Sequence, residues 1–256
     1  MAEAASGDGA GVVIVTGGGR GIGAAVARLA GARGYAVAVD YVQNETGALG
    51  VVRDIQRAGG RATALRGDVS REEDVLRLFE AAGRELGPLV ALVNNAGVTG
   101  GFSRFEELSI DAVRHVLSVN VLGAMLCARE AIRRMSIRRG GPGGSIVNVS
   151  SRAAQLGGAG EWVHYAATKG AIESFTIGLA REVAGDGIRV NAVSPGLIET
   201  DLHASAGAPD RTARLAPSIP MGRPGTPEEV AEGVLWLISP AASYITGTIL
   251  AISGGR

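Results

Sequence analysis

Seven short apolar runs alternate with longer helical patterns along the whole chain, and this alternation constrains the fold more than any other feature. The runs lie at 12–16, 36–41, 62–67, 89–95, 145–150, 188–193 and 248–253. Most are continuously apolar, as expected for strands of a parallel sheet that is covered on both faces. Helical patterns occupy 21–33, 45–58, 71–86, 109–135, 163–184 and 227–238. The sequence therefore predicts a doubly wound α/β fold with a seven-stranded parallel sheet.

No boundary divides this pattern, so residues 11–256 are predicted to form a single domain after a flexible N-terminal tail at 1–10. Residues 196–225 break the rhythm with a long stretch rich in Gly, Pro, Ala and Ser. A loop of this length predicts a lid over a substrate, with an ordinary excursion of short helices as the alternative. Two helix starts carry capping-box signals, at Ser70–Glu73 and at Thr226–Glu229.

The charge balance and the cysteine content exclude several classes of protein. The chain has 25 basic and 25 acidic side chains, which does not favour nucleic acid or an anionic membrane as a partner. The single Cys127 rules out an internal disulfide and suits a reducing compartment. No signal-peptide pattern and no uninterrupted apolar run of about 18 residues is present. A cytoplasmic protein is expected, with no metal, because Cys127, His115 and His203 lack metal-ligand spacing.

The first predicted strand runs into a glycine-rich turn and an Ala-rich helix, VVIVTGGGRGIGAAVARLA. Such a turn lets the backbone approach a diphosphate, and the helix start directs N–H groups at the anion. No Gly-Lys-Ser/Thr follows, so a nucleoside-triphosphate loop is excluded, while a plain connector is the alternative. The predicted cofactor contacts of this Rossmann-type turn are Gly17, Gly19, Arg20, Gly21, Ile22 and Gly23.

Lys169 is the only lysine among the 25 basic residues, and it follows Tyr165 by four positions. The i,i+4 spacing places both side chains on one helix face. An ammonium close to the phenol would lower the pKa of Tyr165 from about 10 and allow proton transfer. Ser151, just after the fifth predicted strand, can donate a hydrogen bond to a substrate oxygen that gains charge. Taken alone, a Tyr/Lys pair more often lies on a solvated helix face, and a serine after a strand more often belongs to a turn.

Together, TGGGRGIG, NNAG at 94–97, Asn120, Ser151, YAATK at 165–169 and SPGLIET at 194–200 resemble the classical short-chain dehydrogenase/reductase family, with its bacterial sugar dehydrogenases and 3-oxoacyl-carrier-protein reductases as similar members. The resemblance implies a catalytic set of Asn120, Ser151, Tyr165 and Lys169, in which Asn120 holds a proton-relay water. It implies further cofactor contacts at Tyr41, Asp68, Val69, Asn95, Ala96, Gly97, Tyr165, Lys169, Pro195, Gly196, Ile198 and Thr200. The spacing from Ser151 to Tyr165 is one residue longer than in many members, and Ser150 is the alternative serine.

Two signals disagree about the cofactor. The guanidinium of Arg20 could bind a 2′-phosphate, whereas an acidic residue at the end of the second strand would repel it. The resemblance places that acidic position at Tyr41, one residue after Asp40. Because strand side chains alternate faces, Asp40 is expected to point away from the ribose. NADP(H) is therefore favoured, with NAD(H) possible.

The expected function is hydride transfer between NAD(P)(H) and a carbonyl or secondary alcohol: a sugar, a 3-oxoacyl thioester or a small ketone. A non-catalytic NAD(P)-sensing protein and a methyltransferase are the alternatives. Candidate substrate contacts are Arg152, Gln155, Glu161, Trp162, Leu202 and His203, and His164 is expected to be a flanking surface residue. By resemblance, the helices at 109–135 and 163–184 pair between subunits, giving a homotetramer or a homodimer.

Overall fold

The computed structural model describes residues 11–201 and 206–256, so the predicted tail at 1–10 and the candidates Leu202 and His203 lie outside the described part. Seven parallel strands form one sheet in the order β3-β2-β1-β4-β5-β6-β7. Their bounds are β1 (Val12–Val15), β2 (Ala36–Tyr41), β3 (Ala62–Arg66), β4 (Leu89–Asn94), β5 (Gly144–Val149), β6 (Ile188–Pro195) and β7 (Ile249–Ile252). The predicted doubly wound, seven-stranded fold is confirmed.

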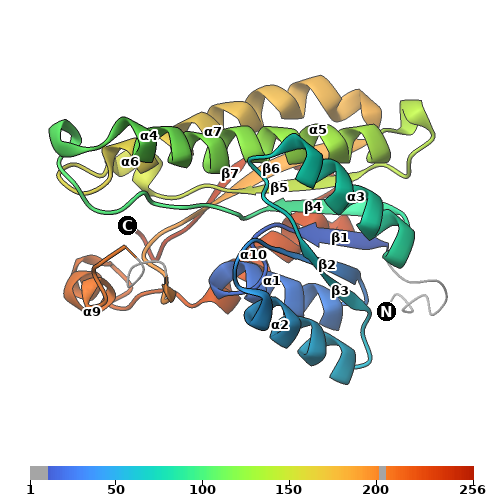
Figure 1. The fold of residues 1–256 in the computed structure, drawn as a ribbon, viewed down its shortest axis with the longest axis horizontal. Coiled ribbons are helices and arrows are strands. Elements are labelled where there is room, and N and C mark those ends of the chain that lie inside the picture. The colour runs from blue at the N-terminus through green and yellow to red at the C-terminus, as the bar shows by residue number, and fades with distance from the viewer. Residues whose placement is uncertain (1–10, 202–205) are drawn as a thin grey trace.

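Helices cover both faces of the sheet (Figure 1). One layer holds α1 (Gly21–Ala32), α2 (Glu45–Arg57) and α10 (Pro227–Ile238), and the other holds α3 (Glu72–Leu86), α4 (Ile110–Leu117), α5 (Ala124–Met135) and α7 (Val163–Val183). Alternate residues of β1 enter two separate cores, Val13 and Val15 on one face and Val12 and Ile14 on the other. Burial on both faces explains why the strands read as continuous apolar runs.

The predicted helix at 109–135 is divided by a wide π-helical turn, Ser118–Gly123, between α4 and α5. Asn120 and Gly123 of this turn are buried. A Cβ at Gly123 would lie 2.7 Å from a side-chain methyl of Val69, so glycine allows the helix to approach the end of the β3–α3 connection. By length and composition Ile110–Met135 could span a membrane. Its inner face, however, supplies Cys127, Ala128 and Ala131 to the core.

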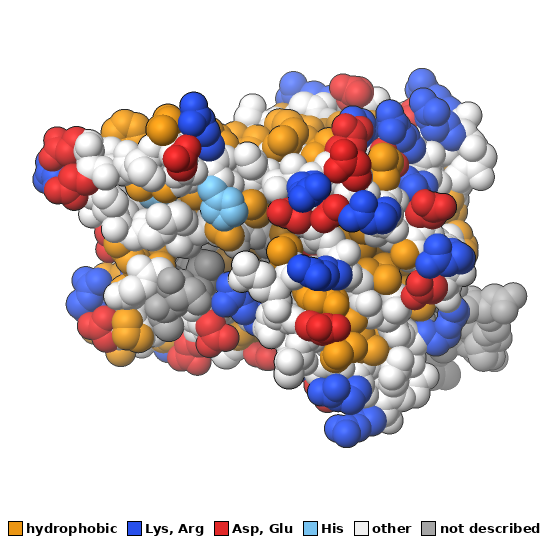
Figure 2. All heavy atoms as spheres, viewed as in Figure 1, with side chains coloured by type: hydrophobic (Ala, Val, Ile, Leu, Met, Phe, Trp, Pro, Cys, Tyr) orange, Lys and Arg blue, Asp and Glu red, His pale blue; other side chains and the backbone are white. Residues whose placement is uncertain are grey.

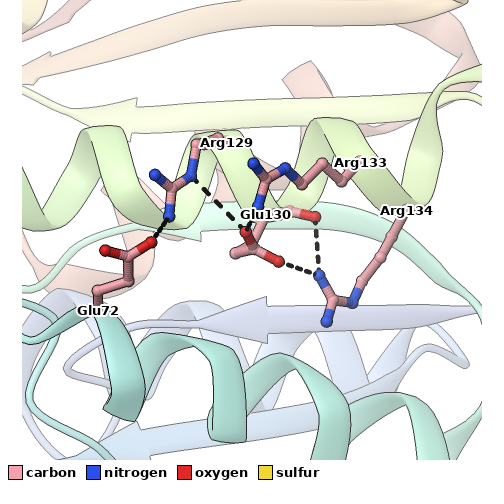
Figure 3. A network of polar contacts seen from close by, with 5 residues as sticks. All are labelled: Glu72, Arg129, Glu130, Arg133 and Arg134. Atoms are coloured by element: carbon pink, nitrogen blue, oxygen red, sulfur yellow. Dashed lines mark hydrogen bonds and ion pairs between the residues drawn. The ribbon is translucent and has the colours of Figure 1, made fainter.

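Arginines around a buried carboxylate of α5 join this helix to α3 (Figure 3). The Glu130 side chain is 3% exposed and forms ion pairs with Arg133 and Arg134, while Arg129 also pairs with Glu72 of α3. Burial alone would raise the pKa of Glu130, but the hydrogen bonds and charges of Arg134 and Arg133 outweigh it and hold the pKa below its usual value. Because each charge is paired, the carboxylate is kept inside at tolerable cost.

One of the two predicted capping boxes is present. The Thr226 hydroxyl accepts a hydrogen bond from the Glu229 N–H, and the Glu229 carboxylate accepts one from the Thr226 N–H at the start of α10. The box at Ser70 is wrong. The Ser70 hydroxyl donates to Asp68 instead, and α3 begins at Glu72 without a side-chain cap.

The long segment between β6 and α10 lies beyond the carboxyl ends of the strands (Figure 1). A parallel bridge between Ile198 and Gly225 joins its two ends. Within it, the short helix α9 (Arg211–Leu215) is followed by a 3₁₀ turn, Ala216–Ser218. The two ends of the predicted lid are thus held together, and α9 lies beyond the carboxyl ends of the strands (Figure 1).

Candidate active site

A cavity of about 850 Å³ opens at the carboxyl ends of the strands, where the chain order reverses between β1 and β4. This switch point is the usual binding crevice of a doubly wound sheet. Every predicted catalytic and cofactor residue lines the cavity except Gly23 and Asn120, which lie behind its wall. On the face shown in Figure 2, basic and acidic side chains are interspersed.

The glycine turn is built for close backbone contact. Gly17 and Gly21 have positive φ angles of 61° and 51°. A Cβ at Gly23 would lie 2.5 Å from the Gly17 carbonyl oxygen and closer still to the Asn95 amide. That amide donates to the carbonyl oxygens of Thr16 and Gly17, at 2.9 and 3.0 Å. The turn therefore leaves backbone rather than side chains at the cavity wall, a surface that fits a diphosphate.

Asp40 and Tyr41 at the end of β2 face opposite sides. The Asp40 side chain is buried, and its Oδ2 atom accepts a hydrogen bond of 3.1 Å from the Gly17 N–H, while Oδ1 has no hydrogen-bond partner among the described residues. Burial, opposed by the bond from Gly17 and assisted by the charges of Asp68 and Asp74, raises the pKa of Asp40 to about 7. Both residues line the cavity, where Tyr41 is half-buried and Asp40 is fully buried. The phenol of Tyr41 is thus the more exposed of the two side chains.

Tyr165 and Lys169 project from α7 toward Ser151 after β5. Both are buried, and the Lys169 Nζ atom lies 5.5 Å from the centroid of the Tyr165 ring. It donates a hydrogen bond of 2.7 Å to the Val149 carbonyl oxygen. The Ser151 hydroxyl accepts from the Ala153 N–H at 3.1 Å. The structure thus brings the predicted serine, tyrosine and lysine together at one end of the cavity.

The pKa values differ from the simple expectation. Burial raises the pKa of Tyr165 to about 12, and only a hydrogen bond with Ser151 works against it. Burial also lowers the pKa of Lys169 to about 8. The expected fall in the pKa of Tyr165 beside Lys169 is therefore not found here, because desolvation by burial dominates. Tyr165 is protonated at neutral pH, whereas Lys169 remains mostly charged.

Asn120 is buried by the wide turn and braces the loop after β4. Its Oδ1 atom accepts from the Val98 N–H at 2.8 Å, and its Nδ2 atom donates to the Val98 carbonyl oxygen at 2.9 Å and to Thr168 at 3.0 Å. A Cβ added at Gly97 would lie 3.4 Å from Asn120 Oδ1 and 3.6 Å from Lys169 Nζ. Gly97 thus leaves the space in which these two polar atoms approach each other.

Two residues next to the predicted catalytic set, His164 and Ser150, were left as side questions by the sequence. The first differs from its expectation, and the second settles which serine lies beside Tyr165. His164 is buried rather than on the surface, because its Nε2 atom lies 2.7 Å from the Thr99 carbonyl oxygen and holds the 99–102 loop. The Ser150 hydroxyl is engaged with Glu173 at 2.9 Å and with the Lys169 carbonyl oxygen at 3.3 Å, whereas the hydrogen bond of Tyr165 is with Ser151. Ser151, and not Ser150, is therefore the serine placed beside Tyr165.

At and beside the cavity wall around Trp162 lie residues that the motifs did not indicate. Phe102 stacks on Trp162 with ring centroids 4.7 Å apart, and Arg211 of α9 pairs with Glu161. Trp162 and Glu161 were candidates from the sequence, but Phe102 and Arg211 were not. No local pattern marks them, since they come from distant loops. Arg152 also lines the cavity, whereas Gln155 does not and donates to Glu173.

Comparisons with known proteins agree with this geometry. A family model described as enoyl-(acyl carrier protein) reductase matches residues 17–256. The uncharacterized oxidoreductase YgfF of Escherichia coli (strain K12) is 50% identical over 96% of this chain and 99% of its own. Cis-4-hydroxycyclohexanecarboxylate dehydrogenase of Sinomonas cyclohexanicum is 42% identical, covering 95% of each chain. A blue fluorescent protein from a metagenomic library, solved in complex with NADPH, superposes with a TM-score of 0.88 at 33% identity over 96% of this chain and 98% of its own.

Proposed function

Because this chain belongs to the short-chain dehydrogenase/reductase family, we propose that its Ser151, Tyr165 and Lys169 catalyse the reversible reduction of a ketone to a secondary alcohol. The chain is an oxidoreductase of the NAD(P)-dependent type that acts on alcohol groups. The observation that carries the proposal is the convergence of a hydroxyl, a buried phenol and a buried ammonium on the cavity that the glycine turn forms.

Each side chain has a distinct role in the proposed reaction. The nicotinamide cofactor, when bound, supplies or accepts the hydride. The Tyr165 hydroxyl gives its proton to the carbonyl oxygen during reduction, and takes it back during oxidation. The Ser151 hydroxyl donates a hydrogen bond to the same oxygen as charge develops there. A pKa of about 12 keeps the tyrosine protonated, as an acid requires.

Lys169 and Asn120 support the proton transfer by Tyr165. The Lys169 ammonium has three donors, one of which is used on Val149, and the others are available for the ribose hydroxyls and for the proton path. Asn120 holds Val98 and the neighbouring backbone in place. Its Oδ1 atom faces the same space beside Gly97 as the ammonium, which suits a proton-relay water between them.

The cofactor end of the cavity favours NADP(H) over NAD(H). Asp40 is buried beneath the turn and binds Gly17, so its carboxyl group is not presented to a ribose. Asp40, Tyr41 and Arg20 all line this end of the cavity, but only the Asp40 side chain is fully buried. A guanidinium can bind a 2′-phosphate through two hydrogen bonds, and an uncharged phenol does not repel it. The NADPH complex of a structural relative is in line with this preference.

The proposed substrate is a secondary alcohol on a saturated ring, or the matching ketone. Beyond Tyr165 the cavity is lined by the flat side chain of Trp162, on which Phe102 stacks. Apolar ring faces suit aromatic walls of this kind. The relative from Sinomonas cyclohexanicum is named for a substrate with a hydroxyl on a cyclohexane ring, which supports a ring compound over a linear acyl thioester.

The first experiment measures NADPH absorbance with a panel of cyclic ketones, sugars and oxoacyl thioesters. Tyr165→Phe keeps the ring and removes the proton, so turnover should be abolished while calorimetric cofactor binding is retained. Tyr244→Phe is the matched control, because Tyr244 is fully exposed. Turnover by the Tyr165→Phe variant at a rate near that of the parent would refute the proposed role.

We also propose a homotetramer in the cytoplasm. Leu117, Leu122 and Met125 are exposed along α4, the wide turn and α5, and Ile177 is exposed on α7. A helix with a second apolar face requires a second partner, and subunit pairing would cover these side chains. Light scattering should give the mass of four chains, or of two if only one pair of helices associates. A stable monomer would contradict the proposal.

A further inference from the structure

Arg211 is a buried arginine at the end of the cavity opposite the glycine turn. Its guanidinium carbon lies 4.6 Å from the centroid of the Trp162 ring and 5.8 Å from that of Phe102. It also forms an ion pair with Glu161, and the residue is only 7% exposed. A buried guanidinium is costly unless it is paired and packed, so these contacts determine where α9 can lie.

The aromatic pair leads from Arg211 to the reacting group. Trp162 directly precedes α7, and its carbonyl oxygen accepts the hydrogen bond from the Ala166 N–H. Its ring lies 5.3 Å from the Tyr165 ring, centroid to centroid. One continuous row of contacts therefore joins α9 to the proposed catalytic phenol through Arg211 and Trp162.

The hydrogen bonding of Arg211 is incomplete. Its Nε atom is buried and has no hydrogen-bond partner in the described part of the chain. A buried donor without an acceptor is uncommon in a folded protein. The guanidinium is thus held by the Glu161 carboxylate and by the ring faces of Phe102 and Trp162. If Arg211 left these rings, its Nε atom would lose no hydrogen bond.

We propose that Arg211 is a positioning residue, whose stacking on Phe102 and Trp162 and pairing with Glu161 fasten α9 across the far end of the cavity. With α9 fastened, the cavity is closed at this end and the substrate is held against Tyr165. With Arg211 released, the substrate end opens and the cofactor end is unchanged. The kinetic role rests on the proposed function of Tyr165, whereas the contact itself does not.

Tryptophan fluorescence tests the contact without any need for activity. The chain has two tryptophans, so Trp236→Phe on the outside of α10 leaves Trp162 as the only reporter. In that background, Arg211→Met should make Trp162 at least about threefold more accessible to acrylamide quenching, because a desolvated cation–ring contact is lost. Arg214→Met on the same helix is the control, since Arg214 is exposed. Equal quenching in parent and Arg211→Met overturns the proposal.

Steady-state kinetics tests the consequence. Arg211→Met should raise KM for the alcohol or ketone about tenfold or more, with kcat and the cofactor dissociation constant within about twofold of the parent. Increased quenching with an unchanged KM overturns the positioning role. A loss of cofactor affinity as large as the rise in KM also overturns it, because it would indicate general damage to the fold. Retained turnover by Tyr165→Phe would refute the proposed function alone.

Arg211→Lys keeps the proposal testable if the methionine variant does not fold. A lysine preserves a cation for Glu161 but not the planar group that stacks on the rings. The double variant Glu161→Gln/Arg211→Lys loses the ion pair as well as the stacking. For Arg211→Lys alone, both the acrylamide quenching of Trp162 and KM should lie between the values of the parent and those of this double variant. A lysine variant that matches the parent in both measurements overturns the stacking argument.

Discussion

Replacing Asp40 with asparagine should change how the stability of the protein depends on pH. The native pKa of Asp40 is about 7, against 3.8 for the free side chain. The native state therefore binds the proton more tightly than the unfolded chain, and stability is lost as the pH rises from about 4 to 7. The loss amounts to roughly 1.7 kcal/mol at pH 5 and roughly 4 kcal/mol at pH 8. The amide of Asp40→Asn stays neutral and can still accept from the Gly17 N–H.

Urea unfolding at pH 5 and at pH 8, followed by circular dichroism, measures this difference. The free energy of unfolding of Asp40→Asn, relative to the parent, should increase by about 2.5 kcal/mol between the two pH values. Asp111→Asn serves as the control, because the Asp111 side chain is 86% exposed and its replacement should not change the pH dependence. If the free energies of unfolding of Asp40→Asn and of the parent change with pH in parallel, the buried Asp40 carboxyl group does not destabilise the protein at high pH.

Lys169→Arg keeps the charge but not the compact donor, so kcat/KM should fall by more than about tenfold, or roughly 1.4 kcal/mol; a smaller loss would contradict the role of the lone lysine. Arg20→Ala should lower kcat/KM for NADPH far more than for NADH, and an equal loss would exclude a phosphate contact. Gly23→Ala should lower the free energy of unfolding in urea by about 1–3 kcal/mol, because its Cβ would meet Asn95. Gly83→Ala on α3 has open space around it and should not destabilise the chain.

The sheet and its two helical layers were predictable because local pattern and tertiary environment agree. Continuous apolar runs require burial on both faces, and the strands found here are buried in that way. Thr226 is a cap as expected, because its hydroxyl accepts the hydrogen bond from the Glu229 N–H. At Ser70 the same local signal failed, since Asp68 accepts the hydroxyl and leaves the helix start without its cap.

The reacting groups were also predictable, but their energetics and their surroundings were not. Motif spacing identifies Tyr165 and Lys169, whereas the pKa of a phenol depends on how deeply it is buried. The burial of His164 depends on a carbonyl oxygen of the 99–102 loop, far from it in sequence. Arg211 meets Trp162 only after the chain has folded, so no short pattern could have pointed to that contact.

The wide turn at Ser118–Gly123 also limits how this chain can tolerate changes in length. An α-helix advances about 100° per residue, so deleting a residue from α4 or from the start of α5, outside the turn, would rotate the helix on one side against the other by that angle. Such a rotation within α5 would turn Cys127 and Ala131 away from the core and separate Arg129 from Glu72 of α3. A single deletion that looks harmless on one helix would thus disturb the site through Asn120 and the core together. Insertions and deletions should therefore be far less tolerated here than in the surface loops.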